Sequence, residues 1–354
     1  MKVLIVDDSI VFRTQINTAI NGISGIEVAS TAPNGSIALQ KLEQHSIDIV
    51  TLDMEMPDMN GIEVLKRIRE KNFPVKVIVF SSQTTRGAEK AIEALQNGAD
   101  DIVAKPNMDG ATQTPSDMIR GVLVPKILQF KSVNQSEEKP IIKKSSIILD
   151  SAPKGSYQQT PILSYKPRML MIASSTGGPN ALETIFAEIR PPLKLPILIT
   201  QHMPPVFTQI LAKRIQDMTG LPCKEGEHGE VVQPGSIYIA PGDFHMEIEG
   251  NMAQHRIKLT KLPQRNSVRP AADFMFETGS DIFAENMVGI VLTGMGEDGL
   301  EGAKKIKNNG GGMIIQSKET CVVFGMPGAV YNEGCYDITY GLKEITNYIN
   351  RVAK

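Results

Sequence analysis

The feature that most constrains this 354-residue chain is a repeated alternation of short apolar runs with segments of helical periodicity. In the first part of the chain, apolar runs of strand length lie at 2–6, 47–52, 75–80 and 101–104, with a weaker one at 26–31. Segments with helical spacing of apolar residues fit between these runs. Strands that alternate with helices indicate a parallel, doubly wound sheet. We therefore expect a five-stranded α/β domain over residues 1–128.

The alternation resumes near residue 167, after a stretch that lacks it. Residues 131–168 hold seven Lys or Arg against three Asp or Glu, with little periodicity, which is typical of a flexible linker. The later strand-like runs lie at 169–173, 195–200, 287–292 and 312–316. Short strands and turns over 222–260 indicate a small antiparallel insertion. The predicted organisation is a first domain over 1–128, a linker over 129–166 and a second doubly wound α/β domain over 167–354.

Composition argues against several classes of protein. The 37 Lys and Arg nearly balance the 39 Asp and Glu, giving a net charge of −2, so charge does not favour binding to nucleic acid or acidic membranes. No apolar stretch reaches the roughly 18 residues of a spanning helix, and the apolar run before Asp7 is too short for a signal peptide. The three cysteines are odd in number and widely spaced, which fits a reducing cytoplasm. We expect a cytoplasmic protein without membrane insertion.

Charged and polar side chains gather at the predicted strand ends of the first domain. Asp7, Asp8 and Asp53 directly follow apolar strands, whose carboxyl ends share one edge of a parallel sheet, where ligands bind. Carboxylates crowded in this way repel one another unless a cation lies between them, and oxygen ligands suit Mg²⁺. Ser81 and Lys105 end two other strands at the same edge and could hold a phosphoryl group. The alternative, helix caps and solvated turns, would have to hold at all of these positions.

These residues, with the segment 53–61 and the Ser81-Ser82 and Lys105-Pro106 pairs, resemble the receiver domain of two-component response regulators over residues 1 to about 125. The resemblance implies that Asp53 accepts a phosphoryl group from a histidine kinase in a Mg²⁺-dependent transfer. The residues that it assigns to the ion and the phosphoryl group are Asp8, Asp53, the Glu55 backbone carbonyl, Asp7 (through water), Ser81 and Lys105. Ile102 departs from the family pattern, because many receivers carry an aromatic switch residue there.

In the second domain, a serine lies on a strand-to-helix turn. Residues 173–179, Ala-Ser-Ser-Thr-Gly-Gly-Pro, place small residues on both sides of Ser175. Such a turn exposes the hydroxyl at a helix N-terminus, in a loosened form of the nucleophile elbow. Glycine-rich turns of this kind more often bind phosphate, but this one lacks both GxGxxG and a GK[ST] ending. Ser174 is the rival nucleophile, and position within the turn favours Ser175.

A serine nucleophile needs a base, because its hydroxyl is barely ionised near neutral pH. His202 ends the strand-like run near 195–201 and is expected at the same sheet edge as Ser175. Asp298 follows another strand and could accept a hydrogen bond from His202, with a helix N-cap as the alternative role. The remaining histidines of this domain are expected at the surface (His228, His255) or in a structural position (His245). The chain order Ser, His, Asp matches none of the familiar hydrolase orders, so the geometry would be convergent.

An ordered set of motifs within 167–350 resembles the catalytic domain of protein-glutamate methylesterases, the chemotaxis response regulators that demethylate chemoreceptors. The motifs are 175–178, 200–205, 240–243, 269–270, 292–296, 298–299 and 322–327. The resemblance implies that Ser175 is the nucleophile, His202 the general base and Asp298 the acid that orients it, with no cofactor in this half. It also implies deamidation of receptor glutamines and a receiver that covers the catalytic edge until it is phosphorylated. Ala173 and Glu297 replace a usual glycine and a common asparagine.

The resulting hypothesis is a phosphorylation-regulated serine esterase that acts on glutamate methyl esters of chemoreceptors, with a chemotaxis histidine kinase as phosphodonor. Backbone N–H groups near Met295 and Thr176 are expected to stabilise the oxyanion. The alternatives are a response regulator with a non-catalytic protein-binding output domain, a DNA-binding regulator and a nucleotide-dependent enzyme. The near-neutral charge and the lack of a basic helix-turn-helix argue against DNA binding.

Overall fold

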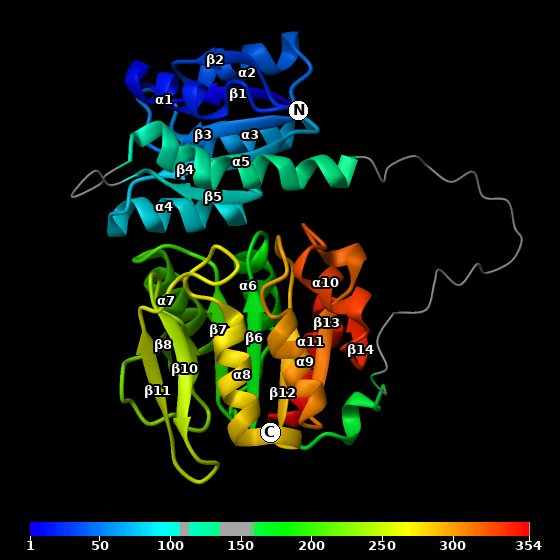
Figure 1. The fold of residues 1–354 in the computed structure, drawn as a ribbon. Helices are drawn as coiled ribbons and strands as arrows, with labels where there is room; N and C mark the ends of the chain where they lie inside the picture. Colours follow the sequence, from blue (N-terminus) through cyan, green and yellow to red (C-terminus); the bar gives the residue numbers. More distant parts are fainter. Residues whose placement is uncertain (107–112, 135–156, 158, 354) are drawn as a thin grey trace, which may run out of the picture. The chain divides into compact units, whose positions relative to one another are not determined.

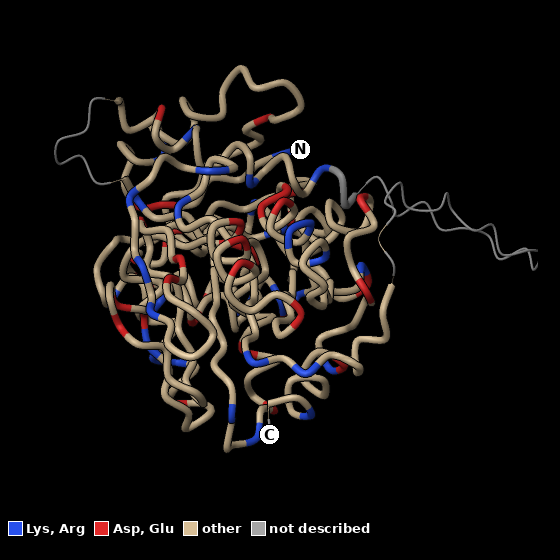
Figure 2. Tube along the Cα trace, turned by 60° about the horizontal axis from the view of Figure 1, so that its bottom comes forward, with Lys and Arg blue, Asp and Glu red and all other residues tan. Residues whose placement is uncertain are grey.

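The computed structural model describes residues 1–106, 113–134, 157 and 159–353, and it divides into two compact units, Met1–Lys139 and Pro140–Lys354 (Figure 1). Acidic and basic residues are interspersed along the trace, in keeping with the net charge of −2 (Figure 2). Within the described residues, no helix combines the length and apolarity that a membrane crossing needs.

The first unit is a five-stranded parallel sheet with the order β2-β1-β3-β4-β5. This confirms the predicted five-stranded, doubly wound parallel sheet. Its strands are β1 (Lys2–Val6), β2 (Glu27–Ala32), β3 (Ile49–Asp53), β4 (Lys76–Ser81) and β5 (Asp101–Ala104). Its helices are α1 (Ile10–Ile20), α2 (Gly35–Gln44), α3 (Gly61–Glu70), α4 (Thr85–Gln96) and α5 (Pro115–Asn134).

Helix α3 begins immediately beside the end of β3. Asn60 and Glu63 form a capping box, in which each side chain accepts a hydrogen bond from the other residue's backbone N–H. A Cβ on Gly61 would lie 2.5 Å from the Asp53 carbonyl oxygen. Only a residue without a side chain lets the helix start this close, and the contact places the helix N-terminus against the carboxyl end of the strand.

The second unit contains a seven-stranded parallel sheet with the order β14-β13-β12-β6-β7-β9-β8 and a separate antiparallel pair, β10–β11. Its strands are β6 (Met169–Ser174), β7 (Ile197–Gln201), β8 (Cys223–Glu225), β9 (Ile237–Ile239), β10 (His245–Gly250), β11 (His255–Thr260), β12 (Met287–Val291), β13 (Gly312–Gln316) and β14 (Ile338–Tyr340). Its α-helices are α6 (Gly178–Ala187), α7 (Phe207–Thr219), α8 (Ala272–Phe283), α9 (Leu300–Asn308), α10 (Met326–Glu333) and α11 (Leu342–Val352). The doubly wound α/β prediction is confirmed.

The antiparallel insertion is smaller than the span predicted for it. Among the strands of residues 222–260, β10 and β11 pair antiparallel and an isolated antiparallel bridge joins Val231 to Arg256, whereas β8 and β9 extend the main sheet in parallel. The sequence pattern of a short strand does not specify its partner, so this difference could not be read from the 222–240 segment alone.

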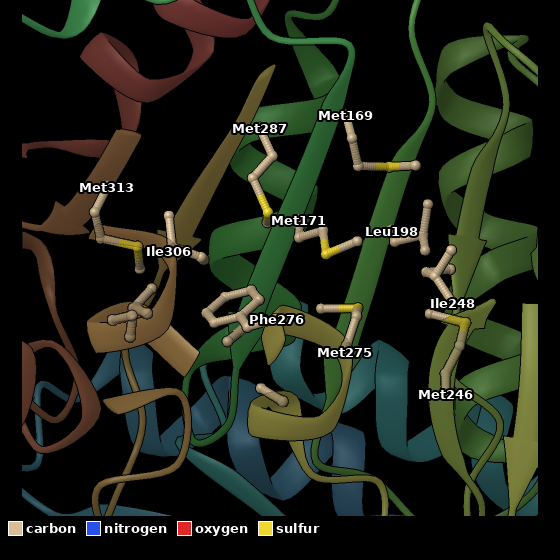
Figure 3. Close-up of a cluster of buried hydrophobic side chains, with 14 of the residues drawn as sticks. Met169, Met171, Leu198, Met246, Ile248, Met275, Phe276, Met287, Ile306 and Met313 are labelled. Atoms are coloured by element: carbon tan, nitrogen blue, oxygen red, sulfur yellow. The ribbon is translucent and has the colours of Figure 1, made fainter. Parts of the chain in front are cut away.

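A methionine-rich core holds helix α8 between the main sheet and the antiparallel pair (Figure 3). Met171 and Met287 project from the sheet, Met275 and Phe276 from α8, and Met246 from β10, and all are fully buried. Methionine is flexible and polarisable, so it fills the irregular space between a sheet, a helix and a hairpin. This packing fixes the helix whose N-terminus reaches the candidate site.

The predicted linker, 129–166, falls partly outside the described residues, at 135–156 and 158. Residues 129–134 complete helix α5, so helical structure continues past the predicted boundary at 128. On the other side, the Thr160 N–H donates to Asp337 at 2.8 Å, and Ile162 is buried in the second unit. Asp337 is itself paired with Lys307, whose side chain is also buried. The described end of the segment is therefore anchored on the second unit.

Candidate active site

The two serines in the turn after β6 differ in whether their hydroxyl groups are hydrogen-bonded. The Ser174 hydroxyl is fully buried and donates to the Gln201 side-chain oxygen at 2.7 Å. Ser175 is half-buried, and within the described residues its hydroxyl makes no hydrogen bond. A nucleophile must reach its substrate, so the geometry favours Ser175 over Ser174.

Gln201 at the end of β7 ties the serine turn to the histidine strand. Its side-chain amide donates to the Ser175 carbonyl at 3.0 Å and to the His202 carbonyl at 3.3 Å. A Cβ on Gly178 would collide with the same side chain, so that glycine is needed for the close approach. Sequence reasoning assigned no role to Gln201. The available signal was a polar residue ending an otherwise apolar strand, which is also common in turns.

The loop after β12 lies directly against Ser175. The Ser175 N–H donates to the Thr293 carbonyl at 3.0 Å, and a Cβ on Gly294 would lie 2.8 Å from the Ser175 Cβ. Thr176 is buried, and its carbonyl accepts from the Thr293 hydroxyl at 2.9 Å. Met295 is 39% exposed, and its N–H donates no hydrogen bond within the described residues. The two segments predicted to supply oxyanion donors therefore both lie beside the serine.

His202 and Asp298 come together at the carboxyl edge of the same sheet. The His202 Nε2 lies 2.7 Å from the Asp298 Oδ2, and the His202 N–H donates to the Ser174 carbonyl at 3.0 Å. Burial opposes the charge of Asp298, but the hydrogen bond from His202 and two backbone N–H groups outweigh it and hold the pKa of this carboxyl below its usual value. An ionised carboxylate only accepts, so Nε2 carries the proton and Nδ1 is left as the basic nitrogen.

The N-terminus of helix α8 supplies those two backbone donors to Asp298. The Ala272 N–H donates to Oδ2 at 2.6 Å, and the Asp273 N–H donates to Oδ1 at 3.2 Å. The N-cap of α9 is Gly299, and no side chain caps that helix. Asp298 is therefore not an N-cap of the helix that follows it, which removes the alternative considered from the sequence. It is held by a helix that begins 26 residues earlier in the chain.

Ser175 and His202 end neighbouring strands, since Ser174 pairs with Gln201 in the β6–β7 register. No hydrogen bond between the Ser175 hydroxyl and His202 is present among the described residues. Catalytic hydrogen bonds are often long in the free enzyme and shorten in the substrate complex. The structure thus joins two of the three predicted residues and places the third beside them.

The other histidines of the second unit have partners outside the serine turn. His245 is buried, and its Nδ1 accepts from the Ala271 N–H at 3.1 Å, in keeping with the structural position expected for it. His228 is exposed, and its Nδ1 accepts from a backbone N–H. His255 was expected at the surface, and that expectation is wrong: both ring nitrogens are buried and the ring packs edge-on against Phe283. The polar residues around it in the sequence concealed this contact, which α8 provides.

In the first unit, Asp7, Asp53 and Lys105 form a buried ionic cluster. The Lys105 Nζ lies 3.1 Å from Asp7 and 3.0 Å from Asp53, whose side chains are almost fully buried. The same ammonium lies 4.6 Å from the centre of the Phe12 ring, a contact that sequence reasoning did not predict. The Ser81 hydroxyl donates to the Gly87 carbonyl at 2.7 Å, so it would have to rotate to bind a phosphoryl oxygen.

The carboxylates of Asp7, Asp8 and Asp53 fit a divalent cation. One oxygen from each lies within 4.8 Å of the others, and the Asp53 Oδ1 is buried without a hydrogen-bond partner among the described residues. Burial and the charge of Asp7, opposed by Lys105, raise the pKa of Asp53 to about 6. An unsatisfied oxygen in an all-oxygen donor set suits Mg²⁺. The Glu55 side chain instead pairs with Lys90 at 3.0 Å, and the role of its carbonyl stays a prediction.

Comparison with known proteins identifies relatives of both units. Residues 170–349 match the family model described as CheB methylesterase, and residues 3–113 match that of the response regulator receiver domain. A Trichodesmium erythraeum protein named protein-glutamate methylesterase/protein-glutamine glutaminase is 38% identical over 353 residues, covering 99% of this chain and 98% of that protein. A Thermotoga maritima protein of the same name is 39% identical over 339 residues, covering 95% of this chain and 94% of that protein.

Among solved structures, the crystal structure of the Thermotoga maritima CheB methylesterase catalytic domain is similar to the second unit. It is 41% identical, with a TM-score of 0.51, and the match covers 52% of this chain and 98% of that one. The parallel sheet with a small antiparallel pair is thus shared with a known catalytic domain.

Proposed function

Because the chain belongs to the CheB methylesterase family and carries a response regulator receiver domain, we propose that it hydrolyses glutamate methyl esters of chemoreceptors through Ser175, His202 and Asp298. The observation that carries this proposal is the 2.7 Å bond between His202 and Asp298 at a strand end next to the available Ser175. The same chemistry applied to a glutamine side chain releases ammonia, in keeping with the glutaminase part of the relatives' name.

The acyl-transfer step follows from the positions of the ring nitrogens. His202 Nδ1 takes the Ser175 proton as the serine oxygen attacks the ester carbonyl, and Asp298 stabilises the imidazolium through Nε2–H. The Met295 N–H is the proposed donor to the oxyanion, a contribution of roughly 3 kcal/mol for one such donor. The C–O bond to methanol then breaks, and His202 returns its proton to the leaving methoxy oxygen.

Hydrolysis of the acyl-enzyme regenerates the site. His202 removes a proton from water as its oxygen attacks the acyl carbonyl, and Ser175 leaves with that proton. The products are one glutamate side chain and one methanol. Each step uses the same base, so the orientation of its imidazole by Asp298 matters twice in every turnover.

We propose that Asp53 is the phosphoryl acceptor of the receiver unit and that a chemotaxis histidine kinase is the donor. The Asp53 carboxylate attacks phosphorus as the P–N bond of phosphohistidine breaks, and Lys105 is placed to pair with the new phosphoryl charge. Receiver domains use Mg²⁺ for this reaction. Asp7, Asp8 and Asp53 would hold the ion, which when bound neutralises charge on the carboxylates and the phosphoryl group.

The test of the catalytic proposal is methanol release from a methylated chemoreceptor fragment. Ser175→Ala is expected to lower kcat by at least about 10³-fold, because the nucleophile is lost. Ser174→Ala is the matched control: it removes one internal hydrogen bond of the same turn and should cost no more than roughly tenfold. If Ser175→Ala releases methanol as fast as the wild type, the second unit is a binding module or uses another nucleophile.

A further inference from the structure

The loop that leads to helix α8 makes a tight turn with two residues in the left-handed region. Asn266 has φ 54° and Ser267 has φ 62°, and Arg265 and Val268 exchange backbone hydrogen bonds across them at 3.3 and 3.1 Å. This is the pattern of a type I′ turn, for which Asn is well suited at the first central position. The turn alone would therefore explain why an asparagine is present, and any further role must rest on its side chain.

The Asn266 side chain joins two buried carboxylates. Its amide nitrogen lies 3.0 Å from the Asp273 Oδ2 and 3.2 Å from the Asp298 Oδ1. The two carboxylates are 1% and 2% exposed, so neither can rely on bulk water for compensation. A side-chain amide carries two N–H bonds, and it can therefore serve both acceptors at once.

The surrounding charges explain why this donor is needed. Asp273 also lies 3.3 Å from the Arg265 Nε and accepts from the Gly302 N–H at 2.9 Å, while Arg265 is further engaged by Glu277. Burial and the charge of Asp298 raise the pKa of Asp273 to about 6, because each carboxylate disfavours the negative charge of the other. The His245 ring accepts from the Ala271 N–H beside the start of α8, and burial lowers its pKa, so it adds no positive charge at neutral pH. Arg265, the shared amide and the backbone N–H groups of Ala272, Asp273 and Gly302 stabilise this pair of carboxylates.

We propose that Asn266 is a positioning residue of the esterase site. Its side-chain amide bridges Asp298 to Asp273 and so holds the Asp298 carboxylate, which in turn orients the His202 ring. The proposal deepens the function proposed above and rests on the role given there to Asp298. Asn266 and Ser267 also line a cavity of about 1040 Å³ together with Gly296, Glu297 and Phe324. The bridge thus lies between the Asp298 carboxylate and the open space of this cavity.

Loss of the bridge has two separate consequences. Without the amide, Asp298 is less tightly oriented, so the imidazole spends less time in the productive geometry and kcat falls. In addition, Asp298 loses a donor that partly neutralises it, so it becomes a stronger acceptor for the His202 Nε2–H, and the NMR signal of that proton moves downfield. A residue that served only the turn would produce neither effect once the turn was preserved.

The experiment compares full-length wild type with Asn266→Gly, Asn266→Asp and the control Ser267→Gly. Glycine keeps the left-handed turn and removes the amide, and aspartate keeps the shape but adds a third carboxylate. Kinetics with a methylated receptor fragment give kcat and KM, and NMR of the His202 Nε2–H proton reports its hydrogen bond to Asp298 in each protein. Thermal unfolding checks that each variant is folded.

We expect Asn266→Gly to lower kcat by roughly 10- to 100-fold with little change in KM, as for loss of a hydrogen bond to a charged group. The His202 Nε2–H signal should move downfield in Asn266→Gly and further downfield in Asn266→Asp, while Ser267→Gly stays close to wild type. An unchanged kcat in Asn266→Gly overturns the proposal, and so does a lowered kcat with an unchanged Nε2–H signal. The NMR measurement does not need turnover, so failure of the proposed esterase function is distinguished from failure of this proposal.

Discussion

At the residue scale, the two sites shift the pKa of a buried carboxyl in opposite directions. Asp298 accepts from a histidine, two backbone N–H groups and an amide, and its pKa is lowered. Asp53 has one lysine partner and one oxygen without any partner in the described structure, and its pKa is raised to about 6. The Asp298 carboxylate has its hydrogen-bond donors within the protein, as suits a permanently charged orienting acid. The Asp53 carboxylate still needs a partner, which a cation and then a phosphoryl group would supply.

A pH-dependent response to Mg²⁺ follows from the raised pKa of Asp53. Below about pH 6 the proton competes with the ion, so Mg²⁺ should stabilise the receiver unit much more at pH 7.5 than at pH 5. Calorimetry of the full chain with and without Mg²⁺ at both pH values measures this as a shift in the Tm of that unit. Equal shifts at the two pH values, or an undiminished shift in Asp53→Asn, would contradict the assigned site.

The same carboxyl also sets how metal-free stability depends on pH. Its pKa in the folded protein is above the unfolded value of 3.8, so the folded state binds the proton more tightly, and stability is lost as pH rises from about 4 to 6. Asp53→Asn removes this cost and should stabilise the metal-free unit at pH 7 by about 3 kcal/mol, with no gain near pH 3.

Sequence reasoning identified the candidate functional residues of both sites but not the residues that hold them. Ser175, His202 and Asp53 stand at or directly after apolar strands, and Asp298 lies in the turn that follows β12. The parallel-sheet rule places each of them at the carboxyl edge of its own sheet. Gln201 and Asn266 carry no comparable signal, because a polar residue at a strand end or in a turn is usually solvated. Their roles depend on two helix and loop segments meeting in space, which spacing along the chain does not reveal.

At the element scale, glycines allow a helix and a loop to approach the two sites closely. Gly61 opens α3 against the Asp53 carbonyl, and Gly294 lies against Ser175. The alternation of strands and helices was readable because parallel strands buried on both faces are continuous apolar runs. The parallel pairing of β8 with β9 could not be predicted from the sequence, because strands of three residues have too few positions to show a pattern.

A matched pair of glycine substitutions in the first unit tests the close approach of α3. Gly61→Ala places a Cβ 2.5 Å from the Asp53 carbonyl oxygen and should destabilise this unit by about 1–3 kcal/mol. Gly121→Ala, inside α5 with nothing within 4 Å, should stabilise it by about 0.4–1 kcal/mol. Urea unfolding of both variants gives the two signs, and a neutral Gly61→Ala would show that the helix start is not constrained as described.

At the scale of the whole molecule, the chain combines a phosphoryl acceptor and an esterase in two units joined through residues that the structure describes only in part. The relatives that match nearly the full chain carry one name for the combined activities. A regulatory link needs only a differential stabilisation of two states by the phosphoryl group, typically 1–3 kcal/mol.

We expect a small phosphodonor with Mg²⁺ to raise methanol release by roughly fivefold or more, through the aspartyl phosphate at Asp53. Asp53→Asn should have the basal rate and no response, because an amide cannot accept the phosphoryl group. Steady-state rates with and without acetyl phosphate measure both. A full response in Asp53→Asn would show that the phosphodonor acts through another residue. No response in the wild type would show that phosphorylation does not control the esterase.

The most direct measurement of the central claim is covalent capture of the nucleophile by a serine-reactive phosphonate, located by mass spectrometry of the digested protein. The account predicts one label on Ser175, with labelling strongly slowed in His202→Gln and in Asp298→Asn and retained in Ser174→Ala. A label on another residue, or labelling of Ser175 at an undiminished rate when either partner is replaced, would contradict it.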